Sequence, residues 1–262
     1  METVISADGT GIAYWREGSG PPLLLVHGGV CDHLAWHFVV PFLARKFTVY
    51  TFDRRGRGES GDTPPYAVER ELDDIDALLQ MIRAPAHLLG HSAGGILALL
   101  AAERTDNLLS LILYEPAFVV DGARQRPAPD VLEKMRSLLA AGDPDEVIRI
   151  AMRETLALSE SEIAAMEAGP GWEHLRAVAH TVPDDLELWN VPLVPESVHA
   201  VRTRTLLLTG SESPAWLQQA AQAVQAALPF ARLRVLAGQE HHATLTAPEM
   251  FAQVVTNFVE SD

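Results

Sequence analysis

The sequence predicts an α/β protein with a mostly parallel sheet, and three observations lead to this fold class. Short, continuous apolar runs recur along the chain, which is typical of strands buried on both faces of a parallel sheet. Helical patterns separate these runs, so that strand and helix alternate and helices are expected on both faces of the sheet. The alternation stops between residues 121 and 201, where helical patterns follow one another, which indicates a helical insertion.

The expected elements can be given in chain order. Val4–Ser6 and Ile12–Trp15 alternate in polarity on either side of Asp8-Gly9, which is typical of an opening hairpin. Buried strands are then expected at Leu23–Val26, Phe47–Phe52, His87–Leu89, Leu109–Tyr114, Thr205–Thr209 and Leu233–Leu236. Helices are expected between them at His33–Arg45, Tyr66–Ile82, Ala93–Arg104, Trp216–Leu228 and Pro248–Val259.

The insertion predicts a division of the chain into a core, residues 1–120 and 201–262, and a helical cap, residues 121–200. Three helices are expected in the cap, at Val131–Leu139, Asp145–Leu158 and Ser161–Ala168, before Gly- and Pro-broken segments. The cap holds five large apolar residues: Met135, Met152, Met166, Trp172 and Trp189. They either form the cap's own core or line an apolar substrate cavity.

Composition limits the classes of partner. The chain has 262 residues, and 35 Asp and Glu against 20 Lys and Arg give a net charge of −15, which argues against nucleic acid and anionic membranes. The single cysteine, Cys31, excludes an internal disulfide and a cysteine-rich metal site, and we interpret it as packing. A basic start followed by an apolar stretch is missing, and no apolar run reaches the ~20 residues of a membrane span, so we expect a cytoplasmic protein.

The strongest functional signal is Gly90-His91-Ser92-Ala93-Gly94. It follows a predicted strand and begins a predicted helix, the context in which a G-x-S-x-G motif is meaningful. We expect a strained turn that exposes the Ser92 hydroxyl, with Gly90 and Gly94 leaving room for neighbouring backbone. The N-terminus of the helix also stabilises developing negative charge. Ser92 is therefore the predicted nucleophile.

A serine hydroxyl is a weak nucleophile and needs a base, for which His241 is the candidate. His241 follows the last predicted strand, so its loop can return to the sheet edge that carries Ser92. His242, one residue later, is the alternative, and its side chain is expected to point elsewhere. His27 and His91 flank the two key turns and are expected to orient loops rather than bind metal. We predict no metal site.

Four motifs, taken in this order, resemble those of the α/β-hydrolase superfamily, in a capped bacterial branch with a serine nucleophile. They are His27-Gly28-Gly29-Val30, the segment Asp53–Ser60, the segment Gly90–Gly94 and Gly238-Gln239-Glu240-His241. The resemblance covers nearly the whole chain and implies that residues 121–200 are the superfamily's cap. It also implies that the backbone N–H groups of Gly29 and Ala93 form the oxyanion hole. Because the nucleophile is serine rather than aspartate, dehalogenase and epoxide hydrolase chemistry is disfavoured.

The catalytic acid departs from the usual pattern of the superfamily. Most members place an Asp three residues after the glycine that ends the next-to-last strand, and here Ser213 stands at that position. A serine cannot stabilise an imidazolium as a carboxylate does. Glu115 ends the strand after the nucleophile helix, where the haloalkane dehalogenase branch takes its acid, and Glu212 is adjacent to Ser213. We favour Glu115, with Glu212, or no acid at all, as the alternatives.

A second glycine motif needs a separate interpretation. Gly56-Arg57-Gly58-Glu59-Ser60-Gly61 matches G-x-G-x-x-G and follows a predicted strand. A dinucleotide site needs a helix that starts at the motif, whereas Asp62-Thr63-Pro64-Pro65 predicts a turn. We therefore expect no nucleotide cofactor.

These observations predict a serine hydrolase, a carboxylic ester hydrolase that acts on small or medium esters through an acyl-enzyme at Ser92. The predicted partner is a small-molecule ester, and no cofactor is required. Two alternatives keep the same fold. One is a lyase, cyclase or cofactor-free oxygenase that uses the same pocket, and the other is a non-catalytic small-molecule receptor.

Overall fold

The computed structural model describes residues 1–120, 122–124, 126–156, 158–193 and 198–261. Within these residues an eight-stranded sheet has the order β1-β2-β4-β3-β5-β6-β7-β8. β1 pairs with β2 and β2 with β4 in antiparallel fashion, and the remaining neighbours are parallel. The strands are β1 (Glu2–Ile5), β2 (Gly11–Gly18), β3 (Pro22–Val26), β4 (Thr48–Phe52), β5 (Ala86–His91), β6 (Leu108–Tyr114), β7 (Thr205–Gly210) and β8 (Ala231–Leu236).

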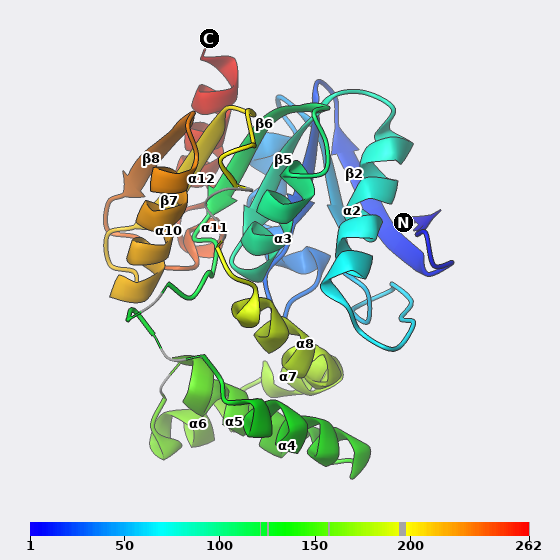
Figure 1. The fold of residues 1–262 in the computed structure, drawn as a ribbon, viewed down its shortest axis with the longest axis vertical. Coiled ribbons are helices and arrows are strands. Elements are labelled where there is room, and N and C mark those ends of the chain that lie inside the picture. The colour runs from blue at the N-terminus through cyan, green and yellow to red at the C-terminus, as the bar shows by residue number, and fades with distance from the viewer. Residues whose placement is uncertain (121, 125, 157, 194–197, 262) are drawn as a thin grey trace.

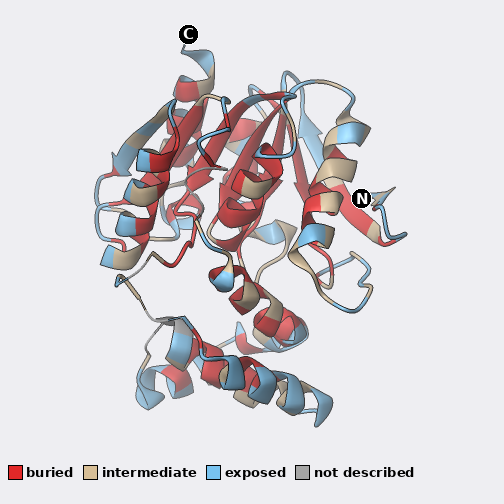
Figure 2. Ribbon diagram, viewed as in Figure 1, coloured by how far each residue is buried: buried red, intermediate tan, exposed pale blue. Residues whose placement is uncertain are grey.

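Helices cover both faces of this sheet (Figure 1). Leu24 and Val26 of β3 pack in one buried cluster with residues of α2 (Val68–Ile82), α3 (Ala93–Ala102) and α10 (Ala215–Ala227). Leu23 and Leu25 of the same strand pack in a second cluster with α1 (Val40–Leu43) and α12 (Pro248–Glu260). Successive side chains of a strand point to opposite faces, so a continuous apolar run is buried on both sides. The buried centre of the sheet is visible in Figure 2, and the predicted α/β class is confirmed.

One predicted helix of the core is wrong. The segment expected as a helix over His33–Arg45 is a 3₁₀ turn, η1 (His33–Trp36), followed by the short α1. The Asp32 side chain accepts the backbone N–H of Leu34 and caps the first piece. Pro41 stands in the first turn of the second piece, where its missing N–H costs nothing, but it cannot continue a helix from the preceding residues.

The region predicted as the cap, for which that name is kept below, consists of short helices that form a separate layer at one end of the sheet (Figure 1). They are α4 (Pro129–Ala140), α5 (Pro144–Ala151), a π-helical turn η2 (Met152–Leu156), α6 (Glu160–Glu167), α7 (Trp172–Val178), η3 (Ala179–Thr181), α8 (Val182–Glu187) and η4 (Leu188–Asn190). The helix expected over Asp145–Leu158 is α5 continued directly by the π-helical turn η2, whereas α7 and α8 were not expected. Residue 121, where the cap was predicted to begin, lies outside the described residues.

The large apolar residues of the cap differ in their surroundings. Met152 and Trp172 are buried in a cluster that belongs to the cap, with Ile148, Ile163 and Ala179. Met135 is fully buried in the larger cluster that includes the sheet, and Met166 is 41% exposed. This supports the interpretation of Met152 and Trp172 as packing residues. None of the described helices combines the length and the apolar character that crossing a membrane requires.

Candidate active site

Ser92 stands in a strained turn between β5 and α3. Its backbone has φ +56° and ψ −120°, and its N–H donates to the carbonyl of Tyr114 at 3.0 Å. A Cβ on Gly90 would lie 2.2 Å from the carbonyl oxygen of Gly94, and one on Gly94 would lie 2.3 Å from that of Val26. Only glycine fits at either position, as the sequence predicts. A non-glycine residue held in such a conformation typically costs roughly 1–3 kcal/mol, and strain of this kind gathers at functional sites.

His241 and Glu115 meet although 126 residues separate them in the chain. His241 lies in the loop after β8, and its Nδ1–H donates to Glu115 Oε2 at 2.5 Å. Glu115 directly follows β6 and is fully buried. The His241 ring lies 4.5 Å from the ring of His91, the residue that precedes Ser92. The structure thus places this histidine–carboxylate pair at the edge of the sheet that carries Ser92.

The remaining partners of Glu115 keep its buried carboxylate ionised. Oε1 accepts the hydroxyl of Thr209 at 2.9 Å and the N–H of Gly210 at 2.8 Å. Burial alone would raise the pKa of Glu115. The hydrogen bond and charge of His241, together with the Ser213 side chain and the Gly210 N–H, have a larger and opposite effect, so the pKa lies below its usual value. A buried carboxylate with these donors can stabilise a protonated imidazole.

The other acid and the other histidine make different contacts. Glu212 is exposed, and its Oε1 accepts the hydroxyl of Ser211 at 3.0 Å. His242 lies next to His241 with ring centroids 5.3 Å apart, and the hydrogen bond to Glu115 belongs to His241. The geometry therefore favours Glu115 over Glu212 and His241 over His242. Their catalytic roles stay predictions.

Two aromatic side chains hold the loop that carries His241. The Tyr114 hydroxyl donates to the carbonyl of Glu240 and accepts the N–H of Ala243 at 3.0 Å. His91 stacks on Tyr114 with ring centroids 4.9 Å apart, and its Nε2–H donates to the carbonyl of His241 at 3.0 Å. Burial, with the nearby charges of His241 and His242, lowers the pKa of His91 well below its usual value. The neutral ring orients a loop, as the sequence predicts.

The HGGV loop, residues 27–30, lies beside Ser92. A Cβ on Gly28 would lie 3.2 Å from Ser92 Cβ. Ala93 is the first residue of α3, and the first N–H groups of a helix have no partner within the helix. Gly29, the other expected oxyanion donor, precedes Val30, whose φ of +54° is exceptional for a β-branched residue. The oxyanion hole itself stays a prediction.

A buried charged network under the HGGV loop was not foreseen from the sequence. Arg54 donates through Nε and Nη2 to Glu71 at 2.7 and 2.5 Å. Its Nη1 donates to Asp185 Oδ1 at 2.9 Å, and Arg57 Nη2 donates to the same oxygen at 2.7 Å. Asp185 belongs to α8 of the cap, whereas the arginines follow β4. The sequence feature that could have pointed to this network is the run of arginines after a predicted strand in an acidic chain. The spacing of residues in the sequence does not reveal which carboxylates pair with them.

The G-x-G-x-x-G segment forms a turn-rich loop after β4. The N–H of Gly56 donates to the carbonyl of Gly61 at 3.0 Å, which closes the loop, and the next helix, α2, begins only at Val68. The glycines therefore do not open a helix, which a dinucleotide site needs. This agrees with the interpretation of the segment as a structural loop.

One group of side chains, within the described part of the chain, has the spacing of metal ligands: Asp32, His33 and Asp53, with ligand atoms within 4.8 Å of one another. Asp53 Oδ1 accepts the backbone N–H and the Nδ1–H of His33 at 2.8 and 2.7 Å. Asp53 Oδ2 accepts the N–H of Glu59 at 2.8 Å. These bonds tie together the loops after β3 and β4. That the chain binds no metal stays a prediction.

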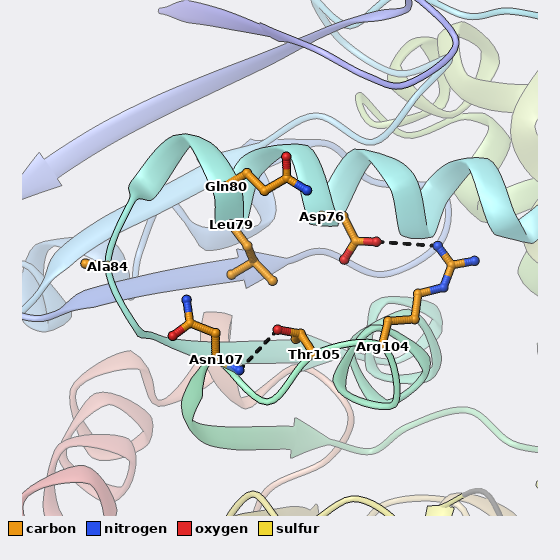
Figure 3. Close-up of a pocket in the computed structure, with 7 residues that line it drawn as sticks. All are labelled: Asp76, Leu79, Gln80, Ala84, Arg104, Thr105 and Asn107. Carbon is orange, nitrogen blue, oxygen red and sulfur yellow. Dashed lines mark hydrogen bonds and ion pairs between the residues drawn. The ribbon is translucent and has the colours of Figure 1, made fainter.

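A surface hollow of about 200 Å³ lies elsewhere, between α2 and the loop after α3 (Figure 3). Its lining includes Asp76 and Arg104, which form an ion pair of 3.5 Å across it (Figure 3). Ala84 and Asn107 also line it and lie just before β5 and β6, whereas Ser92 and Glu115 follow these strands. The hollow therefore lies at the amino-terminal ends of these strands, away from the candidate active site at their carboxyl-terminal ends.

Comparisons with known proteins agree with the fold. An alpha/beta hydrolase of known structure from Sphaerobacter thermophilus is 37% identical, with a TM-score of 0.90 over 98% of this chain and 99% of that one. The uncharacterized hydrolase YraK of Bacillus subtilis is 33% identical over 57% of this chain and 56% of its own length. A pimeloyl-acyl-carrier-protein methyl ester esterase of Aeromonas hydrophila is 34% identical over 51% of this chain and 53% of its own.

The matched part of the chain thus spans about half the length of these two curated relatives. The family model covers far more, because it matches residues 23–254, from the first parallel strand to the last helix. This chain belongs to the alpha/beta hydrolase family.

Proposed function

We propose that this chain is a serine hydrolase that cleaves small or medium carboxylic esters through an acyl-enzyme at Ser92. The observation that carries the proposal is the 2.5 Å hydrogen bond from His241 Nδ1 to the buried Glu115, beside the strained turn that presents Ser92. The 34% identity to a methyl ester esterase over 51% of the chain favours ester substrates over other acyl compounds.

The proposed mechanism uses groups of the chain alone. Because Nδ1 of His241 is engaged by Glu115, Nε2 is the nitrogen left to accept the proton of Ser92. Ser92 Oγ attacks the acyl carbon, and the negative charge on the carbonyl oxygen is stabilised by the N–H groups of Gly29 and Ala93. His241 then protonates the leaving alcohol. Water, activated by the same histidine, hydrolyses the acyl-enzyme and frees Ser92.

The decisive experiment combines turnover with covalent labelling. Wild-type protein should hydrolyse p-nitrophenyl esters of short to medium chain length and react with a fluorophosphonate at Ser92, located by mass spectrometry. A folded Ser92→Ala variant should lose activity by a factor on the order of 10⁶ and should not be labelled. Substantial turnover by that variant contradicts the mechanism. Tight, reversible binding of an ester without turnover or labelling indicates a receptor instead.

A further inference from the structure

Two peptide units of the HGGV loop are fixed by hydrogen bonds to side chains, and two of these side chains, Arg54 and Asp185, lie outside the loop. The N–H of Val30 donates to Asp185 Oδ2 at 2.9 Å. The carbonyl of Gly28 accepts the Nδ1–H of His27 at 2.8 Å and Nη1 of Arg54 at 3.2 Å. Arg54 and Asp185 are both buried, so these bonds are shielded from water.

The bond to Gly28 sets the direction of the expected oxyanion donor. In a trans peptide the C=O of one residue and the N–H of the next point in opposite directions. Because Arg54 and His27 hold the carbonyl of Gly28, the N–H of Gly29 is directed away from the buried Arg54. A donor for a substrate oxygen cannot point into this buried network, so the orientation is the one that the proposed oxyanion hole requires.

Asp185 acts on both fixed peptides. Its Oδ1 accepts from Arg54 Nη1, the same nitrogen that bonds the carbonyl of Gly28, at 2.9 Å. Its Oδ2 holds the N–H of Val30, which retains the unfavourable φ of +54°. A Cβ on Gly29 would lie 2.9 Å from this Oδ2, so the carboxylate packs directly against the loop.

We propose that Asp185 is a positioning residue, which sets the oxyanion geometry of the HGGV loop from the cap and so couples the seating of the cap to catalysis. The proposal rests on the proposed function. Asp185 acts through the backbone of Gly29 and Val30 and does not itself contact the reacting atoms.

The charge of Asp185 matters as well as its shape. Burial alone would raise its pKa. The charges of Arg57 and Arg54, with the N–H of Val30, have a larger and opposite effect, so the pKa lies below its usual value and the carboxylate is ionised. Two buried guanidinium groups thus face two buried carboxylates, those of Asp185 and Glu71. An asparagine at position 185 has one acceptor oxygen. It can serve either the arginines or the N–H of Val30, but not both.

The test is Asp185→Asn, compared with wild type on the best p-nitrophenyl ester. We expect kcat to fall about 10- to 100-fold, as for a small misplacement of a catalytic group, with KM changed less than about threefold. The affinity for a trifluoromethyl ketone with the same acyl chain should fall in parallel with kcat, because both depend on the oxyanion hole. The pH profile of kcat/KM should keep its shape, because His241 and Glu115 are untouched.

The matched control is Glu187→Gln on the same helix, which removes an ion pair with Arg136 within the cap and should leave kcat unchanged. An activity-independent measurement is amide hydrogen exchange at Val30, which should be at least about tenfold faster in Asp185→Asn, since its acceptor is lost. If Asp185→Asn does not fold, Arg57→Lys keeps the positive charge but loses the guanidinium that donates at once to Asp185 Oδ1 and to the carbonyl of Arg55. It should lower kcat about fivefold in the same way.

Several results overturn the proposal. One is a folded Asp185→Asn protein with wild-type kcat and slow exchange at Val30. Another is a raised KM with unchanged kcat, which means that Asp185 only seats the cap. If the wild type neither hydrolyses esters nor reacts with the fluorophosphonate, the proposed function fails, and exchange at Val30 alone decides whether Asp185 holds the loop.

Discussion

The sheet edge and the cap contribute to the candidate active site in different ways. At the sheet edge, the ends of strands place the side chains: Ser92 follows β5, Glu115 follows β6 and His241 lies in the loop after β8. In the cap, short helices pack partly on one another. The cap reaches the HGGV loop through the carboxylate of Asp185. Placement by strand ends follows from chain topology, whereas placement by a buried ion pair depends on residues far apart in the sequence.

Backbone strain separates the two regions in the same way. Among the described residues, positive φ angles outside glycine occur at Val30, Arg83, Ser92 and Glu115, and three of these four lie in loops at the candidate active site. In the cap, the described residues with positive φ are Gly122 and Gly142, which adopt it without a steric penalty. Positive φ at non-glycine residues is thus concentrated where the chemistry is proposed, and the described residues of the cap show none.

The largest effect is expected from Glu115→Gln. The amide can still accept from Thr209 and Gly210, but its NH₂ group faces Nδ1 of His241 and favours the tautomer that cannot take the serine proton. We expect kcat for a p-nitrophenyl ester to fall about 10⁴-fold, as for neutral replacement of a triad carboxylate. The thermal unfolding midpoint is measured alongside, to separate catalysis from folding.

Glu212→Gln is the matched control, because Glu212 is exposed and its carboxylate accepts only the hydroxyl of its neighbour Ser211 among the contacts described. Its kcat should stay within about twofold of wild type. A collapse in Glu212→Gln with a small effect in Glu115→Gln would reverse the assignment of the acid. If neither changes kcat, fluorophosphonate labelling of a His241→Ala variant shows whether His241 is the base.

The sheet could be predicted from the sequence because the parallel strands β3 to β7 are apolar runs buried on both faces, whereas β8 at the edge of the sheet is mostly exposed. The six predicted parallel-region strands agree with β3 to β8 to within about two residues at each end. The helix expected over His33–Arg45 was wrong because apolar spacing continues across Pro41, where the chain starts a new helix. The short helices α7 and α8, of 7 and 6 residues, have too few turns to show a periodic pattern.

The residues of the candidate site also differ in how far the sequence alone could predict them. Ser92 and His241 were predicted from motifs whose chemistry is local to the chain. Glu115 and Glu212 could not be separated from the sequence, because the choice depends on which carboxylate folds against a histidine more than 100 residues from Glu115. Asp185 was missed altogether, since its bond to Val30 spans 155 residues and has no local signature.

A second prediction concerns packing inside the cap. Met152 is 5% exposed in the cluster with Ile148, Ile163 and Trp172. Met152→Ala should lower the free energy of unfolding by about 2–5 kcal/mol, because it leaves a cavity. Relative rates across a series of ester chain lengths should not change. Urea unfolding measures the first effect, and Met166→Ala, at a 41% exposed position, is the control with a change under about 0.5 kcal/mol. A shifted chain-length preference in Met152→Ala would place Met152 in the substrate pocket.

The smallest effect separates two neighbouring carboxylates of α8. Asp185 is ion-paired and ionised, whereas burial, opposed by Arg57 but reinforced by Asp185 and Glu187, raises the pKa of Asp184 to about 7. Between about pH 4 and pH 7 the folded protein therefore holds a proton on Asp184 that the unfolded chain releases. The contribution of Asp184 to the free energy of unfolding is therefore fully present below its pKa in the unfolded chain. It is lost as the pH rises to and through its higher pKa in the folded protein.

Asp184→Asn keeps this position neutral at every pH. The variant should therefore gain on wild type as pH rises. We expect its advantage in the free energy of unfolding to be about 1–2 kcal/mol larger at pH 8 than at pH 5, after a discount because the carboxyl is only partly buried. Urea unfolding of both proteins at the two pH values measures this difference. An advantage that does not change with pH would mean that Asp184, like Asp185, is ionised throughout this range.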